Sequence, residues 1–409
     1  MDLIAFFAAA NSLPDSATMA LPFGIFLSYT TVMVAIKRKL RVVELYAGTG
    51  RSIEPYRSRP EFEVALLADL SHKARETYLA NHEGSPYALI DLKNASAAEI
   101  ERKAQGKIDI LLGCPPCQGF SESGRRETDD PRNDHIVKFA RTIRTLRPLG
   151  FAMENVPLAA ISEQFATFRR IIEGAGYEMS AAVLNAAEYG SAQARQRLVV
   201  VGRRGRGSGL SVSLPSPTHA PIGKYFDYAL GKVRDAEDRD DALLGTTSSA
   251  RRAAPVLDTT FHRDINIVLP TPKLSDTIGD LPATGSPGAL ALAHVPYAHG
   301  PAMLAQMATV PEGGQLDTGG RYHGAAYGRL HGDGLAKTLT RYFSNAGSGR
   351  FWHPTANRSL TVREAARLQG FEDDFSFPGG AAEANTWMIG NALDKALADT
   401  SFDALMRLL

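Results

Sequence analysis

The chain has 409 residues, enough for two or three domains, and carries a formal net charge of +1. This balance excludes the global basic signature of a protein that binds polyanions through overall charge. Only two cysteines are present, and neither is placed for a structural disulfide, which suits a reducing cytoplasm.

An uncharged stretch between Asp15 and Lys37 is long enough to raise the question of a membrane span. Proline, glycine, serine and threonine residues make it only moderately apolar, and the acidic Asp2 and Asp15 do not fit a secretory signal. We therefore expect residues 1–36 to form a dispensable or disordered extension without a membrane anchor.

Two strand-and-turn units are predicted next. A short apolar strand over Leu40–Leu45 is followed by Gly48 and Gly50, which would make a tight turn whose backbone can approach a cofactor. The next strand, residues 63–68, ends in Asp69, about 20 residues beyond the first glycine. Nucleotide-binding folds place a ribose-binding acid at this distance.

A third strand, residues 87–90, ends in Asp91, and a fourth, residues 108–112, leads into the segment GCPPCQGFS at residues 113–121. The fourth strand would bring Cys117 to the carboxyl edge of the sheet, where open α/β sheets bind ligands. The two prolines stiffen this turn. A thiol in such a place suits nucleophilic attack where its thiolate is stabilised.

Cys114 and Cys117 also form a Cys-x-x-Cys pair, which has two other interpretations, a redox dithiol or half of a zinc site. A structural zinc needs four ligands, and the sequence has no second cysteine pair and no His-x-x-x-His spacing. A redox dithiol opens a helix near the start of a small domain, whereas this pair lies deep in a long chain. The redox alternative stays open on this segment alone.

Amphipathic helices such as residues 72–81 and 135–146 alternate with the strands up to Gly202, as a doubly wound α/β sheet requires. The chain then becomes rich in Gly, Pro, Ser, Thr and Asp, with apolar runs that favour an irregular folded region over a disordered linker. A helix is predicted again after Thr361, which forms a capping box with Glu364.

Seven segments, taken together and in their order, resemble the motifs of bacterial-type DNA cytosine carbon-5 methyltransferases, which use S-adenosylmethionine. They are residues 46–50 (YAGTG), 115–118 (PPCQ), 130–133 (DPRN), 154–156 (ENV), 193–197 (QARQR), 358–371 (RSLTVREAARLQGF) and 390–393 (GNAL). The ordered set leaves the redox alternative without its structural context. The resemblance implies a Rossmann-like α/β methyltransferase sheet with helices on both faces and a smaller, irregular target-recognition domain.

The resemblance also divides the chain. Residues 37–203 would form the catalytic and cofactor-binding domain, residues 204–330 the target-recognition domain, and residues 331–409 a segment that returns to complete the catalytic domain.

The catalytic residues implied by the resemblance are four. Carbon 5 of cytosine is a poor nucleophile, so the thiolate of Cys117 would first add to carbon 6 and make an enamine that accepts the methyl group. Glu154 would hydrogen-bond ring nitrogen 3 and the exocyclic amine. Arg197 would contact the cytosine carbonyl, and Arg195 would aid the thiolate or a phosphate. The two arginines are two residues apart in an extended segment, so they are expected to face the same side. The alternative for Glu154 is an ordinary acid at a strand end, and the alternative for the arginines is a solvated basic edge.

The resemblance implies a cofactor site for S-adenosylmethionine and no metal. The glycines of the first turn would approach its amino-acid portion, Asp69 would bind the ribose hydroxyls with Leu70 against the adenine, and Asp91 would accept from the adenine amine. The implied cofactor residues are Tyr46, Gly48, Gly50, Asp69, Leu70, Asp91, Pro116, Asn391 and Leu393.

Four residues depart from the family pattern and bear on cofactor affinity. Tyr46 stands where phenylalanine is usual, Arg51 where another glycine is common, and Asp69 where glutamate is commoner. His135 lies near the position of an aliphatic residue that lines the cofactor.

The implied partner is double-stranded DNA, from which the target cytosine must be flipped because a stacked base cannot present carbon 6 to a thiol. The enzyme would act as a monomer, either alone or beside a separate restriction endonuclease. Two alternatives are a transfer-RNA cytosine methyltransferase and a catalytically silent DNA-binding regulator. The local arginines favour phosphate contacts, or a solvated rim; they are Arg195, Arg197, Arg203, Arg204, Arg206, Arg251 and Arg252.

Overall fold

The computed structural model describes residues 18–20, 26–28, 38–116, 134–205, 213–220, 224–227, 232–235, 269–319, 326–378 and 382–409. Several predicted features fall outside these ranges: Cys117, the DPRN motif at residues 130–133, Arg206, Arg251 and Arg252. Most of the expected extension also lies outside them, apart from an antiparallel pair of short strands, β1 (Thr18–Ala20) and β2 (Phe26–Ser28).

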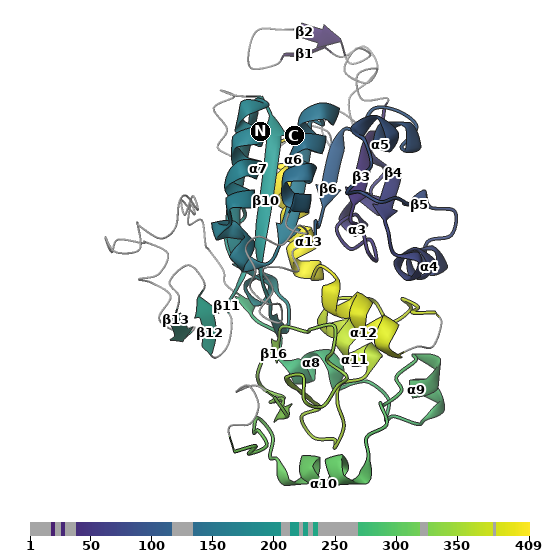
Figure 1. Cartoon of the computed structure of the whole chain (residues 1–409), viewed down its shortest axis with the longest axis vertical. Coiled ribbons are helices and arrows are strands. Elements are labelled where there is room, and N and C mark those ends of the chain that lie inside the picture. Colours follow the sequence, from purple (N-terminus) through teal and green to yellow (C-terminus); the bar gives the residue numbers. More distant parts are fainter. Residues whose placement is uncertain are drawn as a thin grey trace.

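A seven-stranded sheet forms the larger part of the molecule (Figure 1). Its strands are β3 (Leu40–Leu45), β4 (Phe62–Asp69), β5 (Tyr87–Leu89), β6 (Ile110–Gly113), β7 (Gly150–Asn155), β8 (Tyr177–Asn185) and β10 (Gln196–Arg204). They lie in the order β5-β4-β3-β6-β7-β10-β8, and β10 runs antiparallel to both of its neighbours. The strand order changes direction between β3 and β6, because β4 and β5 lie beyond β3 and the later strands lie beyond β6. Ligands are expected at the carboxyl ends of strands at such a point.

Helices cover both faces of this sheet because its central strands are apolar on both sides. All four residues of β6 are buried. One face packs against α5 (Ala97–Lys103), α6 (Asp134–Leu146) and α7 (Glu163–Gly174). The other packs against α3 (Glu54–Arg57), α4 (His72–Asn81) and the last helix, α13 (Lys395–Met406). The predicted Rossmann-like sheet with helices on both faces is therefore confirmed.

A second hydrophobic core lies beyond the carboxyl edge of the sheet, in the lower part of Figure 1. The short helices α8 (Leu274–Ile278), α11 (Val362–Leu368) and α12 (Ala382–Asn391) contribute to it. Two more short helices, α9 (Pro287–Ala291) and α10 (Pro301–Thr309), lie in the same part of the molecule. The predicted capping box is confirmed, since the Thr361 hydroxyl accepts from the Glu364 N–H and the Glu364 carboxylate accepts from the Thr361 N–H.

The remaining described elements of the molecule are two- to four-residue strands and two short 3-10 turns. The strands are β9 (Gln193–Ala194), β11 (His219–Ala220), β12 (Lys224–Asp227), β13 (Lys232–Asp235), β14 (Leu269–Pro270), β15 (Gly328–Arg329), β16 (Ala336–Lys337) and β17 (Arg350–Trp352). The 3-10 turns are Pro157–Ile161 and Ala186–Tyr189. Within the described ranges, no helix is long and apolar enough to cross a membrane.

The predicted C-terminal segment, residues 331–409, contributes to both parts of the molecule. Phe343, Phe351 and Ile389 belong to the second core. Side chains from Leu393 onward pack on the sheet instead.

Candidate active site

The first turn follows β3 and has the backbone form that its glycines allow. Tyr46, Gly48 and Gly50 have φ angles of 56°, 51° and 74°. A Cβ on Gly48 would meet nothing within 4 Å, whereas one on Gly50 would lie 2.4 Å from the ring of Tyr78. Gly48 thus leaves open space for a ligand, while Gly50 allows the turn to pack against α4.

Asp69 ends β4 and holds the first turn in place. One carboxylate oxygen accepts from the Gly48 N–H at 2.9 Å, and the other accepts from the Ser71 N–H at 2.9 Å. Leu70 beside it is 66% exposed. The exposed Asp91 carboxylate, beyond β5, accepts from the Lys93 N–H and from the Asn94 amide.

Tyr46 and His135 are in direct contact. The hydroxyl of Tyr46 and Nδ1 of His135 lie 3.2 Å apart, and the two rings meet edge to face with centroids at 5.4 Å. Burial lowers the pKa of His135, which favours the neutral form of the imidazole. Two residues that depart from the family pattern therefore form one pair at the edge of the first turn.

The segment that leads to Cys117 is fixed by a residue that sequence reasoning passed over. The buried Asn155, at the end of β7, donates from Nδ2 to the carbonyl of Pro115 at 3.1 Å, and its Oδ1 accepts from the Val156 N–H. Pro116 is half-buried and is the last residue described before Cys117. The signal for Asn155 was its place in the ENV motif beside Glu154.

Cys114, three residues before Cys117, is half-buried. Burial raises the pKa of Cys114 well above its ordinary value, and the negative charge of Glu154 raises it further. Its sulfur lies 3.5 Å from Oγ of Ser52. A raised pKa disfavours the thiolate form of Cys114, which is the nucleophilic form.

Glu154 and Arg197 form an ion pair at the carboxyl edge of the sheet. Nε of Arg197 lies 2.8 Å from Oε1 of Glu154, and the side chains are 13% and 14% exposed. Gly113, at the end of β6, pairs with Met153, so Glu154 stands beside the start of the segment that carries Cys117.

Arg195 lies elsewhere, which corrects the expectation that the two arginines share a side. The extended segment breaks at Arg195, between β9 and β10, and this residue is 1% exposed. Its guanidinium donates to the carbonyls of Leu339, Gly390 and Ala392. Arg195 thus ties the strand that carries Arg197 to the C-terminal segment.

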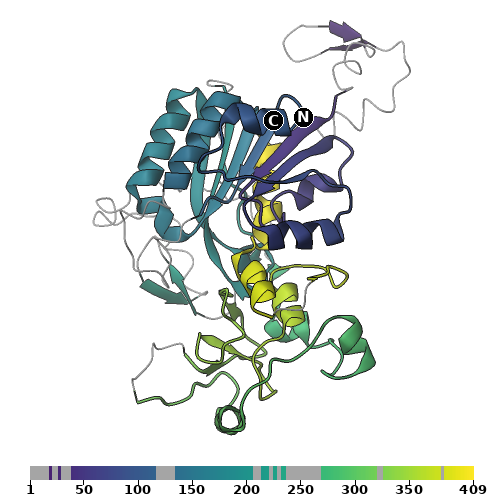
Figure 2. The ribbon, with the colours of Figure 1, turned by 45° about the vertical axis from the view of Figure 1, so that its right-hand side comes forward.

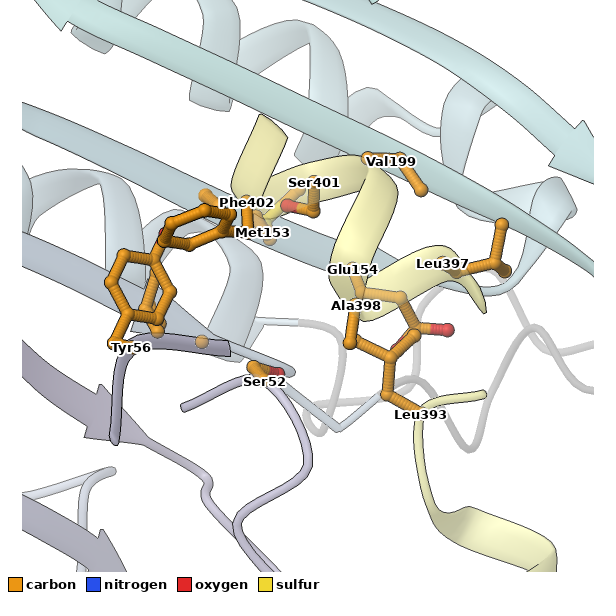
Figure 3. A pocket seen from close by; sticks show the side chains of 13 residues that line it. Ser52, Tyr56, Met153, Glu154, Val199, Leu393, Leu397, Ala398, Ser401 and Phe402 are labelled. Atoms are coloured by element: carbon orange, nitrogen blue, oxygen red, sulfur yellow. The ribbon is translucent and has the colours of Figure 1, made fainter. Parts of the chain in front are cut away.

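The C-terminal residues Asn391 and Leu393 occupy different environments. Asn391 is exposed at the end of α12, whereas Leu393 is 6% exposed and lines a narrow cavity with Ser52 and Glu154. Figure 3 shows this cavity between the sheet and α13, with Tyr56 at its far end.

Gln193 and Arg51 are further residues that sequence reasoning did not assign to the site. Gln193 is fully buried; its Oε1 accepts from the Leu339 N–H at 2.7 Å, and its Nε2 donates to the Leu368 carbonyl. Arg51 donates to the carbonyl of Gly370 at 2.7 Å. No signal in a single sequence predicts the partners of either side chain, because they lie more than a hundred residues away.

Comparison with known proteins decides the family. The model of the C-5 cytosine-specific DNA methylases matches residues 40–267 and 295–407, which is most of the chain. This chain belongs to the C-5 cytosine-specific DNA methylase family. The methylase is 28% identical over 390 residues to Type II methyltransferase M1.HphI of Haemophilus parahaemolyticus, a match that covers 90% of this chain and 87% of that protein.

Other known proteins agree with this result. The methylase is 29% identical over 307 residues to Type II methylase M.HgiDII of Herpetosiphon aurantiacus, which covers 73% of this chain and 76% of that protein. The solved structure of the Dnmt2 methyltransferase of S. pombe has a TM-score of 0.58 and 14% identity, covering 90% and 98% of the two chains. That structure supports the methyltransferase fold alone.

Proposed function

We propose that the protein transfers a methyl group from S-adenosylmethionine to carbon 5 of a cytosine flipped out of a specific double-stranded DNA sequence. Cys117 forms a covalent bond with carbon 6 during the reaction. The single observation that carries this proposal is the Glu154–Arg197 pair, a carboxylate fixed at the carboxyl edge beside the segment leading to Cys117.

The first turn fits the proposed cofactor. Gly48 has open space before it, and Leu70 offers an exposed apolar side chain to an adenine. Asp69 already accepts two backbone N–H groups, but a carboxylate has about four acceptor sites, so it can still bind ribose hydroxyls. S-adenosylmethionine supplies a methyl group on a sulfonium when it is bound. Asp91, Tyr46, Pro116, Asn391 and Leu393 complete the proposed set.

The residues then act on the cytosine in turn. The thiolate of Cys117 adds to carbon 6, which forms the S–C6 bond and opens the C5=C6 double bond. Glu154, oriented by Arg197, hydrogen-bonds nitrogen 3 and the exocyclic amine, where charge develops. Once carbon 5 carries the methyl group it loses its proton; those electrons re-form the double bond as the S–C6 bond breaks. Arg197 also contacts the cytosine carbonyl.

The relatives' names support DNA as the partner and a setting beside a separate restriction endonuclease, because they are Type II methyltransferases. Flipping the cytosine costs a few kcal/mol of stacking and pairing. Arg195 acts in this proposal as a positioning residue, since its guanidinium is engaged by three carbonyls.

The test uses duplexes with 5-fluorocytosine in many sequence contexts, incubated with S-adenosylmethionine. Fluorine replaces the proton that must leave carbon 5, so the covalent complex is trapped. We expect a denaturant-stable adduct with the wild type and with Cys114→Ala, and none with Cys117→Ala. Sequencing the trapped DNA gives the recognition site. A folded wild type that traps no duplex would overturn the proposal; trapping of fluorinated transfer RNA would replace the substrate.

A further inference from the structure

Arg51 directly follows the first turn, residues 46–50, and its side chain extends from there to the Gly370–Phe371 segment. Its guanidinium donates from Nη2 to the carbonyl of Gly370 at 2.7 Å and stacks over the ring of Phe371, 4.3 Å from the centroid. The residue is 8% exposed. Burial of a charged guanidinium is costly, and it lowers the pKa of Arg51, so these contacts must offset a real penalty.

The receiving segment joins several parts of the chain. Phe371 belongs to the second core. Gly370 has a φ of 74°, and a Cβ there would lie 2.4 Å from Cβ of Lys395. The segment therefore packs closely against the start of α13. Gln369 accepts from the side chain of Gln193, two residues before Arg195. A shift of this segment would therefore disturb α13, the second core and β9, the short strand before Arg195.

A second set of contacts lies beside Arg51. Asn81, on α4, exchanges two hydrogen bonds with the backbone of Ser376 at 2.6 and 2.8 Å, and Thr77 donates to the sulfur of Met388 at 3.2 Å. These contacts hold the same interface, but they come from α4. The contacts of Arg51, in contrast, come from the residue directly after Gly50 of the first turn. In Figures 1 and 2 the yellow C-terminal helices run from α12 in the second core to α13 on the sheet.

We propose that Arg51 is a positioning residue that links the first turn to the Gly370–Phe371 segment, so that cofactor and duplex DNA bind cooperatively. This inference rests on the proposed function, since it needs the cofactor at the first turn, and it adds that duplex DNA binds against the second core. A cofactor that fixes the backbone of residues 48–51 also fixes the base of the Arg51 side chain. DNA that holds the second core in the same arrangement then favours cofactor binding, and the coupling must be reciprocal.

The experiment measures the Kd of S-adenosylhomocysteine by calorimetry, without DNA and with a saturating pool of duplexes of random sequence. Arg51→Met keeps the apolar stem and removes the donors and the charge; Phe371→Leu removes the ring from the other side. Arg59→Met is the matched control, because Arg59 also stacks on a ring, that of Phe402 at 4.2 Å, away from the first turn. Thermal unfolding monitored by circular dichroism verifies that each variant is folded.

We expect the duplex pool to tighten S-adenosylhomocysteine binding by about fivefold or more in the wild type and in Arg59→Met. In Arg51→Met and Phe371→Leu the same pool should tighten it by less than about twofold, on the same scale of coupling. Equal tightening in the wild type and in either folded variant, or none in the wild type, would overturn the inference. A wild type that binds no S-adenosylhomocysteine at all would instead overturn the proposed function.

Discussion

The guanidinium of Arg197 and the carboxylate of Glu154 face each other across the antiparallel strands β7 and β10, with Nε and Oε1 2.8 Å apart. Nη1 of Arg197 also donates to the Gln196 carbonyl at 2.7 Å, which fixes the plane of the guanidinium. A carboxylate held this way enters a reaction without first being reorganised, and such preorganisation is a large part of enzymatic rate enhancement.

Removal of the Arg197 guanidinium should therefore slow the chemical step of methyl transfer. For Arg197→Met we expect the single-turnover rate of methylation to fall by about 10²- to 10³-fold, the scale for loss of one preorganised donor. The affinity for S-adenosylhomocysteine, measured by calorimetry, should stay unchanged because this pair is not part of the first turn.

A matched control lies on the same strand. Nη2 of Arg203 is 2.9 Å from Oε2 of Glu178, so Arg203→Met breaks a similar pair away from the carboxyl edge. This control should lose stability and keep its single-turnover rate. Equal loss of rate in both variants would mean that Arg197 acts through the fold alone.

The two glycines of the first turn should respond differently to alanine. Both need a positive φ, so each substitution costs about 1–2 kcal/mol of backbone strain. Gly50→Ala also drives a methyl group into Tyr78, and the fold should lose several kcal/mol in denaturant unfolding, on the order of an overpacked core. Gly48→Ala meets open space, so it should lose only the strain term and weaken S-adenosylhomocysteine binding. A Gly48→Ala protein with unchanged ligand affinity would contradict the assignment.

Elements with strong local signals could be predicted from the sequence, both around the sheet and in the second core. The helix predicted over residues 72–81 is α4, His72–Asn81, and the capping box of Thr361 is present with both hydrogen bonds. The strands predicted over residues 63–68 and 87–90 are β4, Phe62–Asp69, and β5, Tyr87–Leu89, so each predicted end lies one residue from the observed end. Period and capping are properties of neighbouring residues, so a single sequence carries them.

The rest of the region around the second core was harder to predict. Many of its backbone carbonyls accept hydrogen bonds from side chains that are distant in sequence, and not from neighbouring strands. Arg329 donates to the carbonyls of Met307, Val310, His353 and Ala356. Backbone carbonyls in irregular segments need such partners, and the planar fork of arginine supplies several donors at once. Sequence patterns do not distinguish a buried arginine of this kind from a solvated one, and for the same reason the expectation that Arg195 and Arg197 share a side was wrong.

Asn155 offers a test of the segment that leads to the catalytic cysteine. Asn155→Asp keeps the shape but replaces the donor that faces the Pro115 carbonyl with an acceptor. We expect a loss of about 1–3 kcal/mol in the free energy of unfolding, and slower trapping of 5-fluorocytosine DNA because the segment is displaced. Asn345→Asp is the control: Asn345 is exposed and uses its Oδ1 to accept from the Gly347 N–H, which aspartate can also do. Similar trapping rates in both variants would exclude this role for Asn155.

His353 should make the second core sensitive to acid. Its Nδ1 accepts from the N–H groups of Thr355 and Ala356, and its Nε2 lies 3.4 Å from Oε1 of Glu364. Burial lowers the pKa of His353 from 6.5 to about 4, although the nearby Glu364 opposes this. Because the unfolded chain binds the proton more readily, the stabilisation is fully present above pH 6.5 and is lost as the pH falls towards 4.

The lost stability should be on the order of 3 kcal/mol, since one pKa unit corresponds to about 1.4 kcal/mol. It can be measured as the free energy of unfolding in denaturant at several pH values between 7.5 and 4.5. His353→Asn retains an acceptor near Nδ1 and removes the titration, so its stability should fall less steeply over this range. His331→Asn, at a side chain that is 57% exposed, should keep the slope of the wild type. If His353→Asn also keeps that slope, the acid sensitivity arises from another group.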